Sequence, residues 1–587
     1  MWLVLFLLLS FALGVQGQPC TPLRILPAPW PEDFPHPENA GSERIYLLNY
    51  TGGKYFVHWV VLAEKTKNYH FVSSDLHRWQ PIEAELLTRP YYWRGYYYSS
   101  FLWGQLARSR DGVVWEALPA WAFRNFTNLT TNGKLLIAFG GFGDLWTSED
   151  GADTRHRSTV PYLTRPSFSA QAKARRLIFT AAQYVGYTED FETWHQQEAK
   201  FGGPDLIGVL RGWVIGFRSR TQDGETWLDI AKAPEDPAYP FINEPVEMYI
   251  AGQELVGLTS DARRENGQLT DPPTTGLLFY RNPTLEAWER GRILVELVGV
   301  AQKKYYEFDT TRYGWDGKQF FVPLTWHGWD RPHLADKVGI AVFSCADVGD
   351  SQMLVGVIRG EGAAGSFWQS SLFLHYPGEQ QAEVLLQWLP FGQKNANPQE
   401  VRLWLNAGET REYQDVLAEL FPEAAGAGSL RLISVGPTVV AAARTYSRDM
   451  AGTFGQEITP WRWQEGIGQG EEGYIPGLAD SGSLQEGFRT NLGVQNLWVE
   501  PVEVEVVFRD QNGEELARLR RVLRAFEGYQ WFRPLAQHAP AENVSAVVRI
   551  VGESQSRIAA YASRVDNRTG DGTTLRACRL PAQGTVP

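Results

Sequence analysis

The sequence predicts an all-β protein in which a seven-bladed β-propeller is followed by two β-sandwich modules. Three observations carry this prediction: a short motif that recurs about every 40 residues, a turn-and-strand element that recurs with it, and a longer repeat in the C-terminal part of the chain. Regular repetition at this period is typical of stacked supersecondary units. A six-bladed propeller is the alternative, because the last copies of the short motif are degenerate.

The short motif is a hydroxyl residue, any residue, Asp, three residues and then Trp. It begins at Ser73, Ser109, Thr188 and Thr221, and a further copy at Ser148 has Thr154 in place of the Trp. The Asp residues of the five copies lie 36, 39, 40 and 33 positions apart. Asp caps turns through neighbouring backbone amides, and a large indole fills the wedge between two sheets. The motif is therefore predicted to hold the fold and to take no part in catalysis.

The second element is a turn, usually with Gly, followed by a short run of aromatic and β-branched residues. Seven such runs follow turns, beginning near residues 54, 96, 134, 176, 213, 254 and 318. Each run has the length of a β-hairpin arm. Seven units between residues 41 and 350 give about 44 residues per unit, close to a four-stranded blade. The strand before each turn is predicted to be the innermost strand of its blade.

This order of motif and strand resembles the Asp-box propellers, the sialidase-like or BNR-repeat family, over roughly residues 40 to 350. In that family the box lies in the turn between the third and the outermost strand of a blade. The resemblance assigns structural roles to the box residues Asp75, Trp79, Asp111, Trp115, Asp150, Asp190, Trp194, Asp223 and Trp227. The copies here are one residue shorter than the long form of the box, a spacing also seen in five-bladed glycosidases.

A longer repeat begins beyond residue 360. The segment from Phe367 aligns with the segment from Phe488 at an offset of about 120 residues, and both carry alternating apolar residues. Modules of this size with period-two strands resemble immunoglobulin-like sandwiches of exported bacterial proteins. The predicted organisation is a signal peptide at 1–17, an N-terminal segment at 18–40, the propeller at 41–350, sandwich modules at 362–458 and 484–582, and a Gly-rich connector at 459–483. The one helical candidate runs from Tyr413 to Leu420.

The N-terminal residues and the overall charge indicate an exported protein. Residues 1–17 are apolar without an acidic residue, which is typical of a secretory signal and predicts Gln18 as the mature N-terminus. A retained membrane anchor is the alternative, and no later stretch is long and apolar enough to span a bilayer. The net charge is −12 and the acidic residues are scattered along the chain, which disfavours nucleic acid as a partner. We predict secretion, or a place at the cell surface or in the periplasm.

Three cysteines allow one internal disulfide. Cys20 can pair with Cys345 or with Cys578, because chain ends often meet, and the sequence leaves this choice open. No pair of cysteines and no spacing of histidines predicts a zinc site. Phosphate-binding loops, nucleophile elbows and dinucleotide motifs are absent from the sequence. We therefore expect no metal and no cofactor.

Candidate ligand-binding residues lie just before or on the predicted innermost strands. Arg89, Arg124 and Arg165 precede three of these strands, and guanidinium groups suit a carboxylate ligand. Acidic residues stand at the equivalent places of the later blades, among them Glu247 and Glu307. The resemblance to sialidases implies that the three arginines would hold a carboxylate sugar, with Tyr305 and Glu307 as nucleophile pair. Glu247 with Glu307 would serve a glycosidase of the two-carboxylate type. Salt bridges between these arginines and acids are the alternative.

Aromatic residues are more numerous than the box motif requires, with 23 Trp, 24 Tyr and 30 Phe. The groups around Trp93 and Trp326 are predicted to stack on a sugar ring or on a partner's apolar surface, or to pack between blades. The leading prediction is an exported non-catalytic propeller that binds a carbohydrate or a protein. The alternative is a glycoside hydrolase, with a sialidase-like activity as one form of it, that acts in the propeller channel. A fold of this kind does not decide between them.

Overall fold

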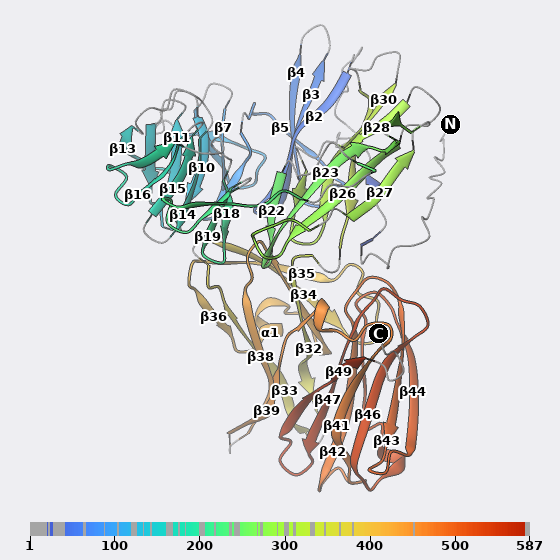
Figure 1. The fold of residues 1–587 in the computed structure, drawn as a ribbon. Helices are drawn as coiled ribbons and strands as arrows, with labels where there is room; N and C mark the ends of the chain where they lie inside the picture. Colours follow the sequence, from blue (N-terminus) through green and yellow to red (C-terminus); the bar gives the residue numbers. More distant parts are fainter. Residues whose placement is uncertain are drawn as a thin grey trace.

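The computed structural model describes residues 20–581. It omits residues 22–23, 27–41, 63–65, 87, 102–104, 119–125, 133, 141–143, 160–167, 174–175, 182–183, 199–205, 217–218, 234–237, 240–246, 267, 271–273, 290–291, 299–303, 309–312, 329–334, 346–347, 363–364, 379–380 and 450–451. The predicted signal peptide therefore lies outside the described residues. The all-β prediction is confirmed, since strands make up almost all of the described elements. The seven sheets that precede β32 form a propeller, drawn from blue to yellow-green in Figure 1.

Each of the first six sheets is a continuous piece of chain in which consecutive strands pair antiparallel. Sheet 1 consists of β2 (Ser42–Thr51), β3 (Lys54–Leu62), β4 (Lys67–Ser73) and β5 (Gln80–Ile82). Sheet 2 consists of β6 (Tyr91–Trp93), β7 (Tyr96–Ser100), β8 (Leu106–Ser109) and β9 (Glu116–Ala117). Sheet 3 consists of β10 (Phe126–Thr131), β11 (Leu136–Gly140), β12 (Asp144–Ser148) and β13 (Arg155–Thr159). Sheet 4 consists of β14 (Phe168–Lys173), β15 (Arg176–Ala181), β16 (Tyr184–Thr188) and β17 (His195–Glu198). Sheet 5 consists of β18 (Leu206–Leu210), β19 (Trp213–Gly216), β20 (Ser219–Thr221) and β21 (Trp227–Asp229). Sheet 6 consists of β22 (Glu247–Ala251), β23 (Glu254–Ala262), β26 (Thr274–Asn282) and β27 (Arg292–Val298). A short hairpin, β24 (Arg264–Glu265) and β25 (Gln268–Leu269), extends sheet 6.

Sheet 7 joins the two ends of the propeller. It contains β28 (Lys304–Phe308), β30 (Phe320–Gly328) and β31 (Ala335–Phe343), with β29 (Gly314–Trp315) beside β30. Its outermost strand is β1 (Arg24–Leu26), from the N-terminus, which pairs with β31. A disulfide between Cys20 and Cys345 fixes this strand. Of the two pairings that the sequence left open, the structure contains this one, and Cys578 is a free, exposed thiol.

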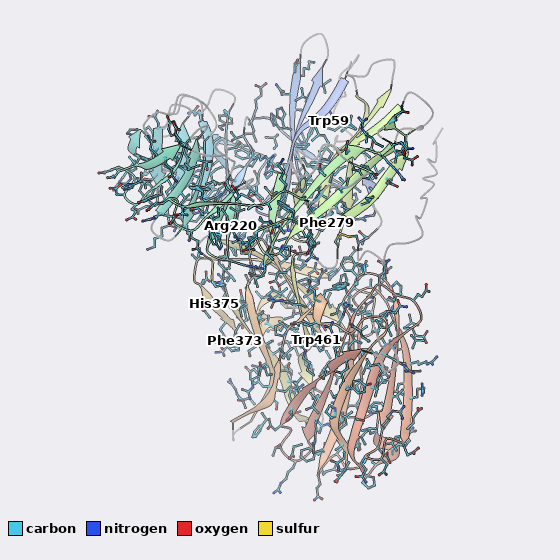
Figure 2. The ribbon with its side chains drawn as sticks, viewed as in Figure 1. Trp59, Arg220, Phe279, Phe373, His375 and Trp461 are labelled. Atoms are coloured by element: carbon cyan, nitrogen blue, oxygen red, sulfur yellow. A yellow bond between two sulfur atoms is a disulfide. The ribbon has the colours of Figure 1, made fainter. Side chains whose placement is uncertain are left out.

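The core of the propeller is divided into seven apolar clusters, and each cluster lies between two neighbouring sheets. One of them joins sheet 7 to sheet 1 through Phe321, Ile340, Trp59 and Phe71. In the described part of the chain, seven sheets and seven joints thus form a closed ring. The first strands β10, β14, β18 and β22 contact one another in sequence, so they are the innermost strands. Trp59 and Phe279, both completely buried, mark two of these joints in Figure 2.

The rest of the chain forms two sandwiches with the same strand order. In the first, one layer holds β35 (Gln399–Leu405), β34 (Ala382–Pro390), β37 (Gly426–Val435), β32 (Asp350–Glu361) and β40 (Trp461–Arg462), and the other holds β36 (Thr410–Tyr413), β33 (Phe367–His375), β38 (Val440–Asp449) and β39 (Gly452–Ile458). The end of β32 also pairs with the start of β33, so the two layers are continuous. The second sandwich repeats this order with β44 (Glu515–Leu523), β43 (Val502–Arg509), β46 (Ala541–Val551), β41 (Glu471–Asp480) and β49 (Cys578–Pro581), and with β45 (Gly528–Trp531), β42 (Phe488–Asn496), β47 (Ile558–Asp566) and β48 (Gly572–Arg576). A short helix, α1 (Val416–Leu420), falls within the predicted helical segment.

The strand order corrects two boundaries of the sequence analysis. Each sandwich starts one strand earlier than the repeat from Phe367 and Phe488 indicates, at β32 and at β41. The segment 459–483 is therefore no plain connector, because it contains β40, a 3-10 turn at Trp463–Glu465 and β41. The glycines of this segment suggest a loop, but one of them lies inside a strand. Gly477 has a φ of 79° and lies at a register shift inside β41, where the strand bulges.

Candidate functional site

The propeller has two faces, and the first sandwich covers part of one of them. The tight turns after the innermost strands and the box turns lie at the same face. The tight turn follows the first strand of a sheet and the box turn follows the third strand, and in an antiparallel sheet these two strands run in the same direction. Turns of sheets 1, 6 and 7 contact the sandwich there, and the backbone N–H of Gly252 donates to the carbonyl of Gly436 at 2.8 Å. Figure 1 shows β34 and β35 below the propeller. We call this side the docked face and the opposite side the free face.

A buried carboxylate is the centre of the contact between propeller and sandwich. Glu383 of β34 accepts a hydrogen bond from the Tyr50 hydroxyl at 2.7 Å, and Arg402 Nε of β35 lies 2.7 Å from the same carboxylate. The Glu383 side chain is only 7% exposed. Loss of hydration raises its pKa to about 7, although Arg402 and Tyr50 act in the opposite direction. A charged group this deeply buried needs both partners in place.

A second ion pair and several close contacts surround Glu383. Lys318 Nζ lies 2.9 Å from Glu400, and Gln387 donates to the same carboxylate at 2.7 Å. Beside them the rings of Tyr92 and Trp404 lie 4.6 Å apart. A glycine is required at position 53, because a Cβ there would overlap the Arg402 guanidinium and the residue has a φ of 85°. The propeller and the sandwich thus form one continuous packed unit at this junction.

The junction residues are not among the residues predicted from the sequence, although β34 carries one local signal of them. Glu383 is the only acidic residue of β34, a strand that is apolar apart from Glu383 and Gln387 and is buried on both sides. A lone acid in a buried strand indicates a specific partner, since an unpaired buried charge is too costly. The partner is more than 330 residues away in the sequence at Tyr50. The residues around Glu383 in the sequence therefore do not indicate that Tyr50 is its partner.

Among the described residues, Arg89 and the backbone of Glu247 and Tyr305 lie near the free face. Each inner strand ends at the docked face and therefore begins at the free face. A predicted site residue lies on the strand, or within three residues before its start, in five inner strands: β6, β10, β14, β22 and β28. Arg89 is exposed and precedes β6. Arg124 and Arg165 lie outside the described residues. Glu247, Tyr305, Glu307 and Trp326 belong to β22, β28 and β30 by their backbone, and their side chains lie outside the described part of the structure.

Trp93 packs between two blades. Of the two roles that the sequence allows for it, stacking on a ligand or packing between blades, its position fits the second, because its side chain is 1% exposed and belongs to the apolar cluster between sheets 2 and 3. Leu106, Leu136 and Tyr98 pack in the same cluster. β6 is only three residues long, so its alternation could not reveal which residue faces the joint. Arg94 lies over the indole, 4.8 Å from the ring centre.

The five box motifs share one hydrogen-bond pattern. In the first, the Asp75 carboxylate accepts from the backbone N–H of His77 and of Arg78, both at 2.8 Å, and the Ser73 hydroxyl accepts from Leu76 N–H at 3.0 Å. The same carboxylate bonds recur at Asp111, Asp150, Asp190 and Asp223. The indole N–H of Trp79, Trp115 and Trp227 donates back to the turn. Trp194 packs edge-on against Phe179. These side chains are engaged in the turns themselves.

The described residues contain neither a metal-binding cluster nor a membrane-spanning helix. No three His, Cys, Asp or Glu side chains in this part of the chain come together as a metal site would require. Among the same residues, no helix is long and apolar enough to cross a membrane.

No family model matches the chain, and no curated protein matches it. Three solved structures are similar in fold. They are the computationally designed Ika8 protein (10% identity, 52% of this chain and 97% of that chain, TM-score 0.30), YCF48 bound to D1 peptide (10%, 58% and 100%, 0.29) and the C-terminal WD40 domain of Sif2 (8%, 51% and 96%, 0.29). These similarities concern the fold alone.

Proposed function

We propose that this chain is an exported, non-catalytic binding protein whose propeller presents its free face to a carbohydrate or protein ligand. The observation that carries the proposal is the junction at Glu383, which holds the first sandwich over part of the docked face. The free face then remains for a ligand. Arg89 and the backbone of Glu247 and Tyr305 lie near the beginnings of inner strands on that face, which supports the proposal.

The two sandwiches serve as a rigid support in this proposal. Besides the junction with the propeller, they are joined to each other by a buried hydrogen bond from Ser429 to Gln495 at 2.8 Å and by backbone bonds such as Gly392 N–H to the Gly528 carbonyl at 2.8 Å. Buried polar bonds of this kind fix a unique orientation. A ligand-binding face on such a support keeps a constant distance from the opposite end of the molecule.

Two features support export. The apolar residues 1–17 are followed closely by Cys20, and Cys20 pairs with Cys345. Structural disulfides form and persist in oxidising compartments. We propose that Gln18 is the mature N-terminus, which the intact mass of the protein from its own host will establish. The five box turns support membership of the Asp-box propellers, and the duplicated sandwiches support an immunoglobulin-like origin, as parts of the same proposal.

Binding at the free face is tested with the full mature chain on an array of acidic and neutral glycans. A variant with Arg89, Arg124 and Arg165 all changed to Ala is expected to lose at least about tenfold in affinity for the glycan bound by the wild type. Arg568→Ala is the matched control, since Arg568 is an exposed arginine of the second sandwich.

A protein ligand is tested in parallel by photo-crosslinking from residue 89 and from residue 568. Cross-links from residue 89 that are missing from residue 568 support the proposal. Ligand contacts that arise only from the sandwiches, or a glycan affinity that the arginine variant leaves unchanged, contradict it.

A further inference from the structure

A cavity of about 310 Å³ lies between the two sandwiches. It is bordered by the edge strand β39 of the first sandwich and the edge strand β48 of the second, with Trp461 and Tyr561 beneath. Figure 2 shows Trp461 where the first sandwich meets the second. This volume is at the lower end of the range of about 300–1,000 Å³ that is typical of small-molecule sites. The cavity is far from the propeller face discussed above, and its role is independent of the proposed function.

An added peptide strand does not fit between these edges. The Thr574 hydroxyl donates to the Glu457 carbonyl at 2.7 Å, and the Gly455 N–H donates to Asp571 at 3.1 Å. The two edge strands are therefore already bridged directly. Strand addition requires a free edge along its length. A compact ligand suits the space better than a peptide.

The floor of the cavity is apolar and aromatic. Val355, Trp461 and Tyr561 are each 4% exposed and belong to the apolar cluster that joins the sandwiches. The Arg576 guanidinium covers one face of the Trp461 indole at 3.7 Å, which fixes the ring. Aromatic side chains held in this way provide apolar contact with a polar edge, as the carbon–hydrogen face of a sugar ring requires.

The rim of the cavity carries uncommitted polar groups of both kinds. Gln456 accepts from Ser563 at 2.8 Å through Oε1, and within the described residues its Nε2 has no acceptor. The hydroxyls of Thr459 and Thr573 and the carboxylate of Glu457 likewise have no hydrogen-bond partner among the described residues. The charge of Arg576 is balanced by Glu465 at 2.8 Å. The rim therefore offers hydrogen-bond donors and acceptors side by side, and its arginine carries no unbalanced positive charge.

We propose that this cavity binds a neutral monosaccharide or disaccharide. Each hydroxyl of a sugar both donates and accepts a hydrogen bond, which matches the mixed rim, and its apolar face matches the floor. A negatively charged ligand would face Glu457 and would find the nearest cation already paired. A side chain at position 572 would crowd Gln456, since a Cβ there would lie 3.0 Å from the Gln456 amide oxygen.

The test uses the full mature chain and saturation-transfer NMR with methyl glucoside, methyl galactoside, methyl mannoside, methyl N-acetylglucosaminide, maltose and cellobiose. At least one of these is expected to bind. Thr459→Trp fills the cavity from its exposed rim and is expected to weaken that binding at least about tenfold. Thr410→Trp is the matched control, because Thr410 is an exposed threonine on β36, at the opposite side of the same sheet.

Glu457→Gln keeps the test valid if the Trp variant does not fold, since it changes only an exposed carboxylate. It is expected to weaken binding several-fold. Failure of all six sugars to bind overturns the proposal. So does binding that Thr459→Trp, folded as judged by its melting curve, leaves unchanged.

Discussion

Tyr50 of the propeller donates a hydrogen bond of 2.7 Å to Glu383 of the first sandwich, across 333 residues of sequence. The pair lies in a buried cluster that also contains Arg402 and Asp316, and Asp316 accepts a hydrogen bond from Tyr55. This contact fixes the docked face of the propeller, and it makes the joint between the domains sensitive to protonation.

The Glu383 junction predicts a specific pH dependence. Because burial raises the pKa of Glu383 to about 7 in the folded protein, the folded state holds a proton that the unfolded state releases at lower pH. The contribution of Glu383 is therefore most favourable below about pH 4.3, its ordinary value, and declines until about pH 7. Glu383→Gln removes this titration. We expect the melting temperature of the variant, relative to wild type, to rise between pH 5 and pH 8.

The size of this effect follows from the shift in pKa and is on the order of 4 kcal/mol at most. Differential scanning calorimetry at several pH values measures it, and Glu412→Gln, an exposed position on β36, is the control. A difference between variant and wild type that stays constant from pH 5 to pH 8 is incompatible with a titrating Glu383.

The disulfide between Cys20 and Cys345 is expected to stabilise the closed propeller. It holds the N-terminal strand β1 at the edge of sheet 7, and it closes a loop of 325 residues. Cys345→Ser should lower the free energy of unfolding of the propeller by about 2–5 kcal/mol. Calorimetry in the absence of reductant measures the loss. Cys578→Ser should melt like wild type, because Cys578 is a free thiol; equal effects of the two substitutions would argue against the pairing.

The box tryptophans are expected to support the joints between sheets. Trp79 is 7% exposed and packs in the cluster between sheets 7 and 1. Trp79→Ala should cost about 3–5 kcal/mol, the usual cost of removing a buried aromatic side chain. Val114→Ala, in another box turn, is the control, since Val114 is 73% exposed. Urea unfolding followed by fluorescence gives both values, and a loss below about 1 kcal/mol for Trp79→Ala would refute the joint role.

The box carboxylates predict acid sensitivity of the propeller. Hydrogen bonds from the backbone amides of Ala152 and Asp153 hold the pKa of Asp150 below its usual range. A carboxyl group with a lowered folded pKa contributes stability above its unfolded pKa and loses it as the pH falls through the folded one. Circular dichroism melting from pH 5 to pH 2.5 should show a smaller decline for Asp150→Asn than for wild type. Parallel declines would exclude this carboxylate as a source of acid sensitivity.

The propeller was predictable from the sequence because its signals are local. Two of these signals each lie within ten consecutive residues: a Gly turn followed by an apolar strand, and a box turn such as Ser73 to Trp79. The strand order of the sandwiches was less accessible. β32 is bent at Gly356, which has a φ of 98° and a register shift beside it, and β41 bulges at Gly477. Both strands therefore lack the regular alternation that identified their neighbours.

The contacts that join distant parts were not predictable. Neither Tyr50 nor Glu383 carries a local pattern that names the other, and the burial of Trp93 depends on sheet 3, which follows it in the chain. The cavity beside Trp461 is likewise formed by two strands that lie 120 residues apart, from Gly452 and from Gly572. Such sites arise from tertiary packing, which period and composition do not encode.

The most direct test of the central claim is turnover by the purified mature chain, at high protein concentration, on a panel of fluorogenic glycosides that includes a sialoside. A non-catalytic propeller predicts no release from any substrate, with glycan or protein binding retained at the free face. Release that is abolished by Glu307→Gln or by Arg165→Ala would contradict the account and establish a glycoside hydrolase.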